Sequence, residues 1–269
     1  MIIIGEKINS TLKSVRPAIE AYDAEAIRSL AKRQAEAGAA YIDVNAGAFH
    51  ADEADRLAWL VATVRSAVDT PLCLDSPSAA ALEAGLKAYT GATPMLNSIT
   101  DEKERFESIL PLALRHKAKV IALCMDDAGM PETADGRYEI AARLIAKLTA
   151  AGVKPEDIHI DPLVRPVSTG SHYGLAAIET IRRVKNNHPG VRIACGLSNV
   201  SFGLPQRKLI NQAFLISAMA AGMDGAILDP LDNKMMACVA AAEAVLGVDE
   251  YCVEYLEKFR NGLFEGLWK

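Results

Sequence analysis

The sequence has little excess charge, few aromatic side chains and no long apolar run. Its 269 residues carry a formal net charge of −5 and no block of basic residues, which argues against a nucleic-acid partner. No uninterrupted apolar stretch approaches the roughly 18 residues of a membrane-spanning helix. Met1 is not followed by a basic leader and a long apolar core, so we expect a cytoplasmic protein without membrane association.

Closely spaced metal ligands are missing as well. The chain contains five cysteines and five histidines, but no CxxC pair and no HExxH motif. Cys73, Cys124 and Cys195 stand in apolar segments, where we interpret them as small buried hydrophobic residues. The sequence therefore predicts no protein-bound metal.

Aliphatic residues are abundant instead. Hydrophobic residues make up 51% of the chain and aromatic residues only 6%, which suits a buried parallel sheet surrounded by helices. Eight short apolar segments predict strands at 2–6, 41–45, 71–75, 93–97, 119–125, 157–161, 192–195 and 224–228. Helices are expected between and after them, at 23–37, 52–67, 77–89, 100–115, 136–151, 174–187, 207–221 and 233–246, with a further amphipathic helix at 250–262.

This alternation predicts an α/β fold, a single (β/α)8 TIM barrel with an extra C-terminal helix. No linker rich in Pro, Gly and Ser interrupts the chain, so residues 1–269 are expected to form one domain. A doubly wound open sheet is the alternative. The dinucleotide motif GxGxxG of such sheets is absent after the first strand, where Gly5-Glu-Lys7 stands.

Polar side chains gather at the predicted carboxyl ends of the strands, where barrels carry their chemistry. They are Glu6, Asn9, Asp43, Asn45, Asp75, Asn97, Asp161, Ser198, Asn199 and Asp229. A carboxylate can accept two N–H bonds, and an amide can donate and accept at once, so such a ring suits a flat heterocycle with an aminopyrimidinone edge. The alternative is that each Asp or Asn caps the following helix or satisfies loop amides.

Several short motifs in chain order carry a family resemblance. They are Ile3-Ile-Gly-Glu-Lys-Ile-Asn9, Asp43-Val-Asn45 with Gly47, Leu72-Cys-Leu-Asp-Ser76, Leu96-Asn-Ser98, Ile160-Asp-Pro-Leu163, Gly196-Leu-Ser-Asn-Val-Ser201 and Leu209-Ile-Asn211. With them the chain resembles the methyltetrahydrofolate:corrinoid protein methyltransferases, pterin-binding barrels of acetogenic bacteria and O-demethylase systems. The Leu-Asp-Ser and Gly-Leu-Ser-Asn-Val-Ser motifs are the most specific.

The resemblance implies a homodimer that binds tetrahydrofolate or methyltetrahydrofolate as its substrate. It also implies cobalamin carried by a separate corrinoid protein, and the chain has no DxHxxG motif of its own for cobalamin. It places pterin contacts on Asp75, Asn97, Asp161 and Asn199, with Asn199 the catalytic hydrogen-bonding group near N5, the nitrogen that carries the methyl. To this predicted pterin site we add Glu6, Asn9, Asp43, Asn45, Gly196, Ser198 and Arg207.

One departure and two alternatives accompany this resemblance. Phe202 stands where relatives often carry a polar residue. Dihydropteroate synthase is a related pterin barrel, but the segment Gly5-Glu-Lys-Ile-Asn-Ser10 fits that enzyme poorly. A non-catalytic pterin-binding module is the other alternative, and it would bind folate without transferring a methyl group.

Overall fold

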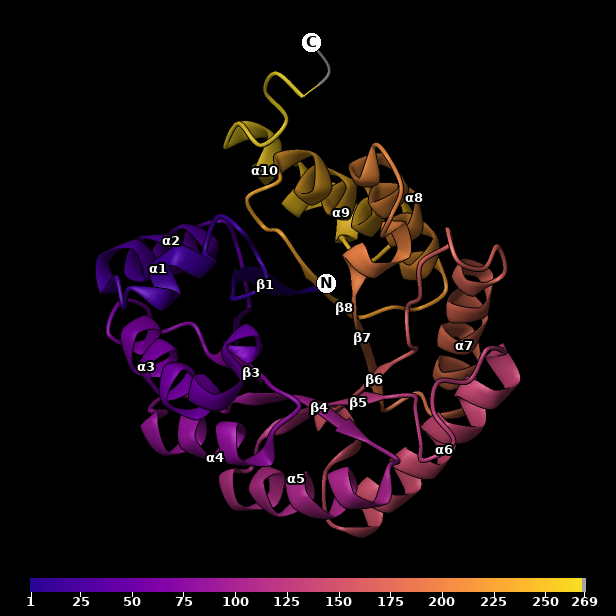
Figure 1. Ribbon diagram of the computed structural model, residues 1–269. Coiled ribbons are helices and arrows are strands. Elements are labelled where there is room, and N and C mark those ends of the chain that lie inside the picture. Colours follow the sequence, from indigo (N-terminus) through magenta and orange to yellow (C-terminus); the bar gives the residue numbers. More distant parts are fainter. Residues whose placement is uncertain (268–269) are drawn as a thin grey trace.

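A computed structural model describes residues 1–267 and contains a closed barrel of eight parallel strands. Strands that follow one another in the chain are also paired in the barrel, and β1 pairs with β8 to close it (Figure 1). The strands are β1 (Ile2–Asn9), β2 (Tyr41–Asn45), β3 (Leu72–Asp75), β4 (Met95–Thr100), β5 (Lys119–Leu123), β6 (Ile158–Asp161), β7 (Arg192–Gly196) and β8 (Gly225–Leu228). The predicted TIM barrel is therefore confirmed, and the open sheet is excluded.

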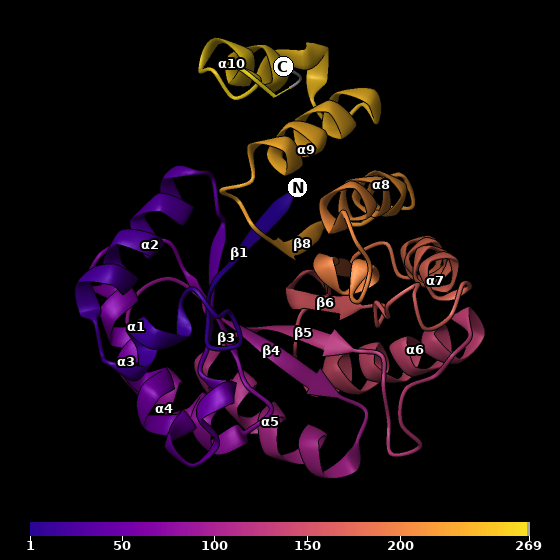
Figure 2. The same cartoon turned by 45° about the horizontal axis from the view of Figure 1, so that its top comes forward.

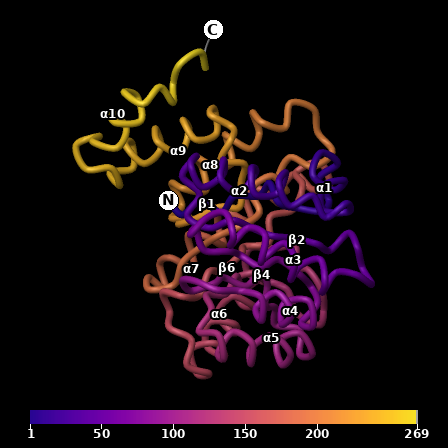
Figure 3. Tube along the Cα trace, turned by 90° about the vertical axis from the view of Figure 1, so that its left-hand side faces the viewer, coloured from indigo at the N-terminus to yellow at the C-terminus, as the bar shows by residue number. Residues whose placement is uncertain are grey.

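Helices surround the barrel, as Figures 1 and 2 show. They are α1 (Arg16–Glu20), α2 (Ala24–Glu36), α3 (Glu53–Arg65), α4 (Ala79–Ala88), α5 (Lys103–His116), α6 (Ala134–Ala150), α7 (Tyr173–Asn187), α8 (Arg207–Ala220), α9 (Asn233–Val245) and α10 (Val253–Arg260). Short 3-10 turns are η1 (Gly47–Asp52), η2 (Pro155–Asp157), η3 (Leu197–Ser201) and η4 (Glu250–Cys252). The extra C-terminal helix is present as α10, which lies against α9 outside the barrel (Figures 2 and 3).

Several element boundaries differ from the prediction, and at β1 and β4 the reason is that tertiary pairing extends the strands. β1 continues past Glu6 to Asn9, where Ile8 and Asn9 pair with β2 after an irregularity in register. β4 continues to Thr100, which pairs with Leu123 of β5, so α5 begins at Lys103 rather than at Thr100. The short helix α1 was not predicted from the sequence.

The barrel interior is apolar over most of its height. Ile4, Tyr41, Cys73, Met95, Ile121 and Ala194 form the inner cluster, with Ile2 and Ile227 packed against it. Cys73, Cys124 and Cys195 are buried as expected, and burial raises the pKa of all three thiols. Polar side chains take over at the carboxyl ends of the strands, which places the candidate site there. Among residues 1–267, no helix has the length and apolar character to cross a membrane.

Candidate functional site

A cavity of about 830 Å³ opens at the carboxyl ends of the strands. The predicted residues that line it are Glu6, Asn9, Asp43, Asp75, Asn97, Asp161, Gly196, Ser198, Asn199 and Arg207. They come from six strands and from the loop and helix after β7, so the closed barrel gathers side chains that are far apart in sequence. We call this space the mouth cavity.

Asn45 is a predicted pterin residue that does not line the mouth cavity. Its amide nitrogen Nδ2 instead donates to Asp75 Oδ2 at 2.9 Å. Its amide oxygen accepts from Ser10 Oγ and from the backbone N–H of Gly47, each at 3.0 Å. Because both ends of the amide are engaged, Asn45 fixes the orientation of Asp75 rather than facing a ligand.

Asp75 is half-buried at the end of β3, and its pKa is raised to about 6. Burial is the largest cause. The hydrogen bond from Asn45 and the charge of Arg105 act against it, and the charge of Glu53 adds to it. Glu53 itself accepts a buried hydrogen bond of 2.5 Å from Ser76 Oγ, directly after Asp75. Asp75 is thus mostly ionised near neutral pH, and the Asn45 amide donates a hydrogen bond to the ionised form.

Asp161 has a similar environment at the end of β6. Its Oδ1 accepts from the backbone N–H of Leu163 at 2.8 Å. Burial raises its pKa to about 6, while backbone N–H groups of the following loop and of Gly196, and the charge of Arg137, lower it. Asp43, 1% exposed on β2, has its pKa raised by burial and by the charge of Asp75.

Asn199 lies in the turn after β7, where its side chain packs closely against the backbone of Gly196. A Cβ atom at Gly196 would lie only 3.1 Å from Asn199 Nδ2, so glycine is the residue that this contact accommodates. Arg207, the first residue of α8, braces the turn by donating to Ser198 O at 2.7 Å and to Ser201 Oγ at 3.0 Å. The motif Gly196–Ser201 therefore positions one amide at the cavity wall.

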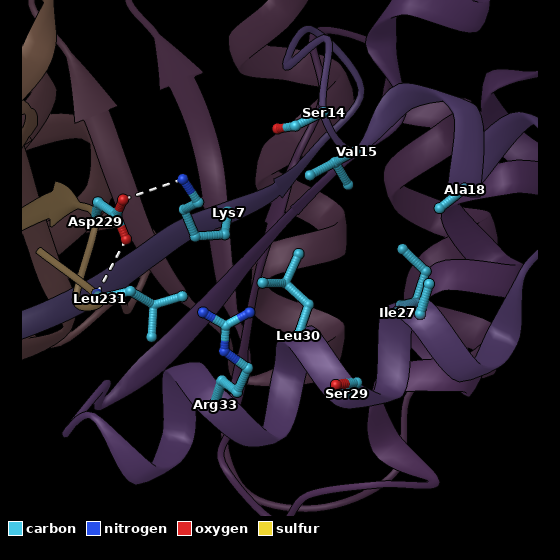
Figure 4. A pocket seen from close by; sticks show the side chains of 11 residues that line it. Lys7, Ser14, Val15, Ala18, Ile27, Ser29, Leu30, Arg33, Asp229 and Leu231 are labelled. Carbon is cyan, nitrogen blue, oxygen red and sulfur yellow. Dashed lines mark hydrogen bonds and ion pairs between the residues drawn. The ribbon is translucent and has the colours of Figure 1, made fainter.

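Glu6 lies on β1, at the seam where β1 meets β8, and lines the mouth cavity together with Ser198 and Asn199. Its pKa is raised to about 7, first by burial and then by the charge of Asp229, whereas Lys7 and Arg207 lower it. Figure 4 shows the neighbouring pair, in which Lys7 Nζ lies 3.0 Å from Asp229 Oδ2. Among residues 1–267, no hydrogen bond to the Glu6 carboxyl is present.

Some cavity residues were not predicted as ligand contacts. Ser98, Arg165, Lys208 and Asn211 also line the mouth cavity, and Arg105 donates to the backbone oxygen of Ser98 at 3.1 and 3.2 Å. Lys208 and Asn211 lie in the first turns of α8, and Arg105 lies in the first turn of α5. Polar residues in the first turns of a helix after a strand-end loop are the signal that would have identified Lys208, Asn211 and Arg105, whereas Ser98 on β4 and Arg165 in the loop after β6 carry no such signal.

No group of three or more His, Cys, Asp or Glu side chains in the described part of the chain could hold a metal ion. The acidic ring of the mouth cavity is spread over strands that surround it, and its raised pKa values favour hydrogen bonding over cation binding. The prediction that the protein binds no metal of its own stays a prediction.

Comparison with known proteins identifies the sequence relatives. The family model described as pterin binding enzyme matches residues 5–229. The methylcorrinoid:tetrahydrofolate methyltransferase of Eubacterium limosum is 39% identical over 264 residues, which cover 97% of each chain. The methionine synthase of Mycobacterium tuberculosis is 34% identical over 241 residues, which cover 85% of this chain but 20% of that protein.

Solved structures with the same fold include dihydropteroate synthases. The enzyme from Vibrio fischeri superposes with a TM-score of 0.69 at 16% identity and covers 91% of this chain and 93% of that one. The enzyme from Xanthomonas albilineans, in complex with 7,8-dihydropteroate, gives a TM-score of 0.65 at 17% identity with 93% of both chains covered. At such low identity these similarities concern the fold alone.

Proposed function

The chain belongs to the family of pterin-binding enzymes, and we propose that it transfers a methyl group between N5 of tetrahydrofolate and the cobalt of a corrinoid. The observation that carries the proposal is the convergence of Asp75, Asn97 and Asp161 in one cavity with Asn199 in its wall. The similarity to the Eubacterium limosum methyltransferase extends over 97% of both chains, which favours this reaction over dihydropteroate synthesis.

The proposed pterin contacts follow from hydrogen-bonding chemistry. Ionised Asp75 and Asp161 each accept N–H groups from the heterocycle, while Asn97 donates to a ring carbonyl and accepts from a neighbouring N–H. An analogue that lacks one of these polar edges leaves buried groups unpaired, at a cost of roughly 1–3 kcal/mol each. The site is therefore selective for the pterin ring.

The proposed reaction needs no nucleophile from the chain. Cobalt in the Co(I) state attacks the methyl carbon, the N5–CH3 bond breaks, and N5 keeps the electron pair. A tertiary amine is a poor leaving group, so N5 must gain a hydrogen bond or a proton as the bond breaks. The Asn199 amide supplies a preoriented donor at the cavity wall, and such donors typically contribute roughly 3 kcal/mol to the transition state. The reverse direction uses the same transition state and the same contacts.

A separate corrinoid protein must reach the mouth cavity for this reaction. Met130, Phe202 and Leu209 are exposed to 55%, 65% and 69%, and Met130 and Phe202 line the cavity. Exposed apolar side chains around a polar cavity are typical of protein-interaction surfaces. They support docking of the carrier over the barrel mouth. Phe202 provides an apolar contact where relatives often have a polar residue.

The homodimer is part of the same proposal. The segment 245–259 exposes apolar side chains from α9 to α10, namely Val245, Leu246, Val248, Tyr251, Val253, Leu256 and Phe259. Together they present apolar area on the order of the 800 Å² per partner of standard interfaces. Light scattering at micromolar concentration tests this, since Tyr251→Asp should shift a dimer toward monomer.

We further propose that the protein works in a reducing compartment such as the cytoplasm. All five cysteines are free in the structure, which suits such a compartment. The organisation of residues 1–269 as one domain is likewise a proposal, supported by the alternation of strands and helices around one barrel.

The test of the proposed function is an anaerobic absorbance assay. Protein, cob(I)alamin and methyltetrahydrofolate are mixed, and loss of the Co(I) band is followed against growth of the methyl-Co(III) band. Protein-dependent conversion is the expected result. Folate binding without conversion, with free cobalamin and with a corrinoid protein, would favour a pure binding module. Absence of folate binding by calorimetry would contradict the assignment of the cavity.

A further inference from the structure

A side chamber of about 120 Å³ adjoins the mouth cavity. Glu6, Ser198, Lys208 and Asn211 line both spaces. The far wall of the chamber contains Asp229 and Asp232, together with Leu197, Leu228 and Met235. The Oδ1 atom of Asn211 is buried and has no hydrogen-bond partner among residues 1–267, so this region contains an unpaired acceptor. The chamber has room for a few water molecules between polar groups.

Glu6 is the acidic side chain that belongs to both spaces. Its charged and titratable neighbours come from its own strand, from β2, from α8, and from the end of β8 with the following N-cap of α9. They are Lys7, Asp43, Arg207, Lys208, Asp229 and Asp232. Two of these carboxylates already have cationic partners: Asp229 pairs with Lys7 at 3.0 Å, and Asp232 pairs with Lys208 at 2.9 Å. Within residues 1–267, Glu6 has no hydrogen-bond or ion-pair partner of its own.

The other acidic groups of the mouth cavity differ from Glu6 in their hydrogen bonds or in their depth. Asp75 accepts from Asn45 and Asp161 accepts from the Leu163 backbone, which prepares both for the ionised form that binds N–H groups. Asp43 lies deeper, at 1% exposure. Glu6 instead shares the chamber wall with Ser198, the residue directly before Asn199. Its place is therefore on the Asn199 side of the cavity, where N5 lies in the proposed function.

We propose that Glu6 is the proton donor for N5, and that it is recharged from solvent through the side chamber. When the methyl group leaves for Co(I), the electron pair of the broken N5–CH3 bond takes the proton of the Glu6 carboxylic acid. The products are N5–H tetrahydrofolate, methyl-Co(III) and the Glu6 carboxylate. In the reverse direction, N5 attacks the methyl group of methyl-Co(III), and the Glu6 carboxylate accepts the N5 proton. This inference rests on the proposed function.

The structure offers a path for recharging Glu6. Asp229 lines the side chamber and also a second cavity of about 510 Å³, which lies between β1, α1, α2 and the segment after β8 (Figure 4). Lys7 points into that lateral cavity, where Ser14, Ser29 and exposed Arg33 make it polar toward solvent. Protons can thus pass between solvent and Glu6 through the Lys7–Asp229 pair, away from the docked carrier.

The test is the pH dependence of single-turnover methyl transfer in both directions. Because the protonated form donates, the wild-type forward rate at saturating methyltetrahydrofolate should be constant below pH about 7 and fall roughly tenfold per pH unit above it. Because the ionised form accepts, the reverse rate from methylcobalamin and tetrahydrofolate should rise through the same pH. Opposite slopes with one midpoint are the signature of a single proton-carrying group.

Glu6→Gln removes the proton but keeps the shape of the side chain. At pH 6 its forward rate should be roughly 100-fold lower than wild type, and the difference should shrink above pH 8, where wild-type Glu6 is ionised. Its dissociation constant for tetrahydrofolate should stay within about threefold. Glu83→Gln, on the exposed surface of α4, is the charge-matched control and should keep the wild-type profile.

Three outcomes separate the hypotheses. A Glu6→Gln variant with the wild-type pH profile in both directions overturns the inference and leaves the proposed function intact. A wild-type protein that transfers no methyl group at any pH overturns the proposed function itself. If Glu6→Gln does not fold, Glu6→Asp serves instead: a profile whose midpoint moves supports the proton donor, and an unmoved midpoint contradicts it.

Discussion

Asp75 at the end of β3, Asp161 at the end of β6 and Glu6 on β1 are half-buried acidic side chains at the barrel mouth, yet their surroundings differ. Asp75 and Asp161 each accept a hydrogen bond, from Asn45 at 2.9 Å and from the Leu163 backbone at 2.8 Å. The Glu6 carboxyl accepts none from residues 1–267 and has Asp229 nearby. Burial raises the pKa of all three, from 3.8 to about 6 for the two aspartates and from 4.5 to about 7 for Glu6; hydrogen bonds oppose the rise at the aspartates, whereas the charge of Asp229 adds to it at Glu6.

The difference shows how one barrel mouth holds carboxyl groups for two tasks. A carboxylate that binds N–H groups must be ionised when substrate arrives, so the fold supplies it with donors. A carboxyl that delivers a proton must stay protonated near neutral pH. The Glu6 carboxyl accepts no hydrogen bond from residues 1–267 that would stabilise its ionised form. We refer to these regions as the reading side (Asp75, Asn97 and Asp161) and the proton side (Glu6 and Asn199).

The largest expected effect is on the proton side. Asn199→Ala should reduce the single-turnover transfer rate at least 100-fold, because one preoriented donor at N5 is lost, while folate binding stays within roughly tenfold. Stopped-flow absorbance and calorimetry measure the two quantities. Asn186→Ala, exposed on α7, is the control. Weakened binding with full turnover at saturation would remove Asn199 from the proton side.

The reading side should show the reverse pattern. Asp75→Ala should weaken tetrahydrofolate binding roughly 10- to 100-fold, because ring N–H groups and the Asn45 amide lose their acceptor, at roughly 1–3 kcal/mol. The transfer rate at saturating folate should change far less. An unchanged dissociation constant by calorimetry would contradict the pairing of Asp75 with the pterin edge.

A smaller effect is expected when pH alone is changed. Folate binding to the reading side needs ionised carboxylates whose pKa is raised to about 6 in the free protein. Affinity should therefore increase from pH 5 to pH 7, roughly tenfold for each carboxylate that must be ionised, and then level off. Calorimetry in buffers with different heats of ionisation should detect proton release on binding at pH 5.5. Affinity that falls across this range would reverse the assigned protonation states.

The smallest expected effects come from changing the charges near Glu6. They should shift the pH midpoint assigned to the proton side and leave the reading side unchanged. Asp229→Asn removes a charge that raises the pKa of Glu6, so the midpoint of the forward pH profile should move down. Lys7→Met removes a charge that lowers this pKa, so the midpoint should move up. At pH 7 each variant should change the rate less than about threefold. Shifts in the same direction would contradict the assignment of the midpoint to Glu6.

Much of the fold could be predicted because it depends on local patterns. Eight apolar segments alternating with helical segments define a barrel, and the polar residues at their ends locate the mouth. The pairing of Thr100 with Leu123 could not be predicted, since it depends on the register between β4 and β5. α1 was missed as well, because five residues are too few for a clear period.

The sequence predicted which polar residues surround the candidate site, but not which of them are hydrogen-bonded to one another. Asn45 and Asp75 both stand at strand ends, and only the register of β2 on β3 shows that Asn45 supports Asp75 instead of facing the cavity. The side chamber depends on Glu6 and Asp229 meeting across the barrel seam, more than 200 residues apart in the chain. No local sequence pattern specifies such a meeting.

The closure of the barrel between β1 and β8 has a consequence for folding. Ile2 to Gly5 pair with Gly225 to Leu228, so this seam joins the first strand of the chain to the last. Contacts of such long sequence separation form late, because a large loop must close before they stabilise anything. The reading side, built from β3 to β6, can assemble during synthesis, whereas the proton side stays open until β8 has emerged from the ribosome. A partly synthesised chain should therefore assemble the reading side of the cavity before the proton side.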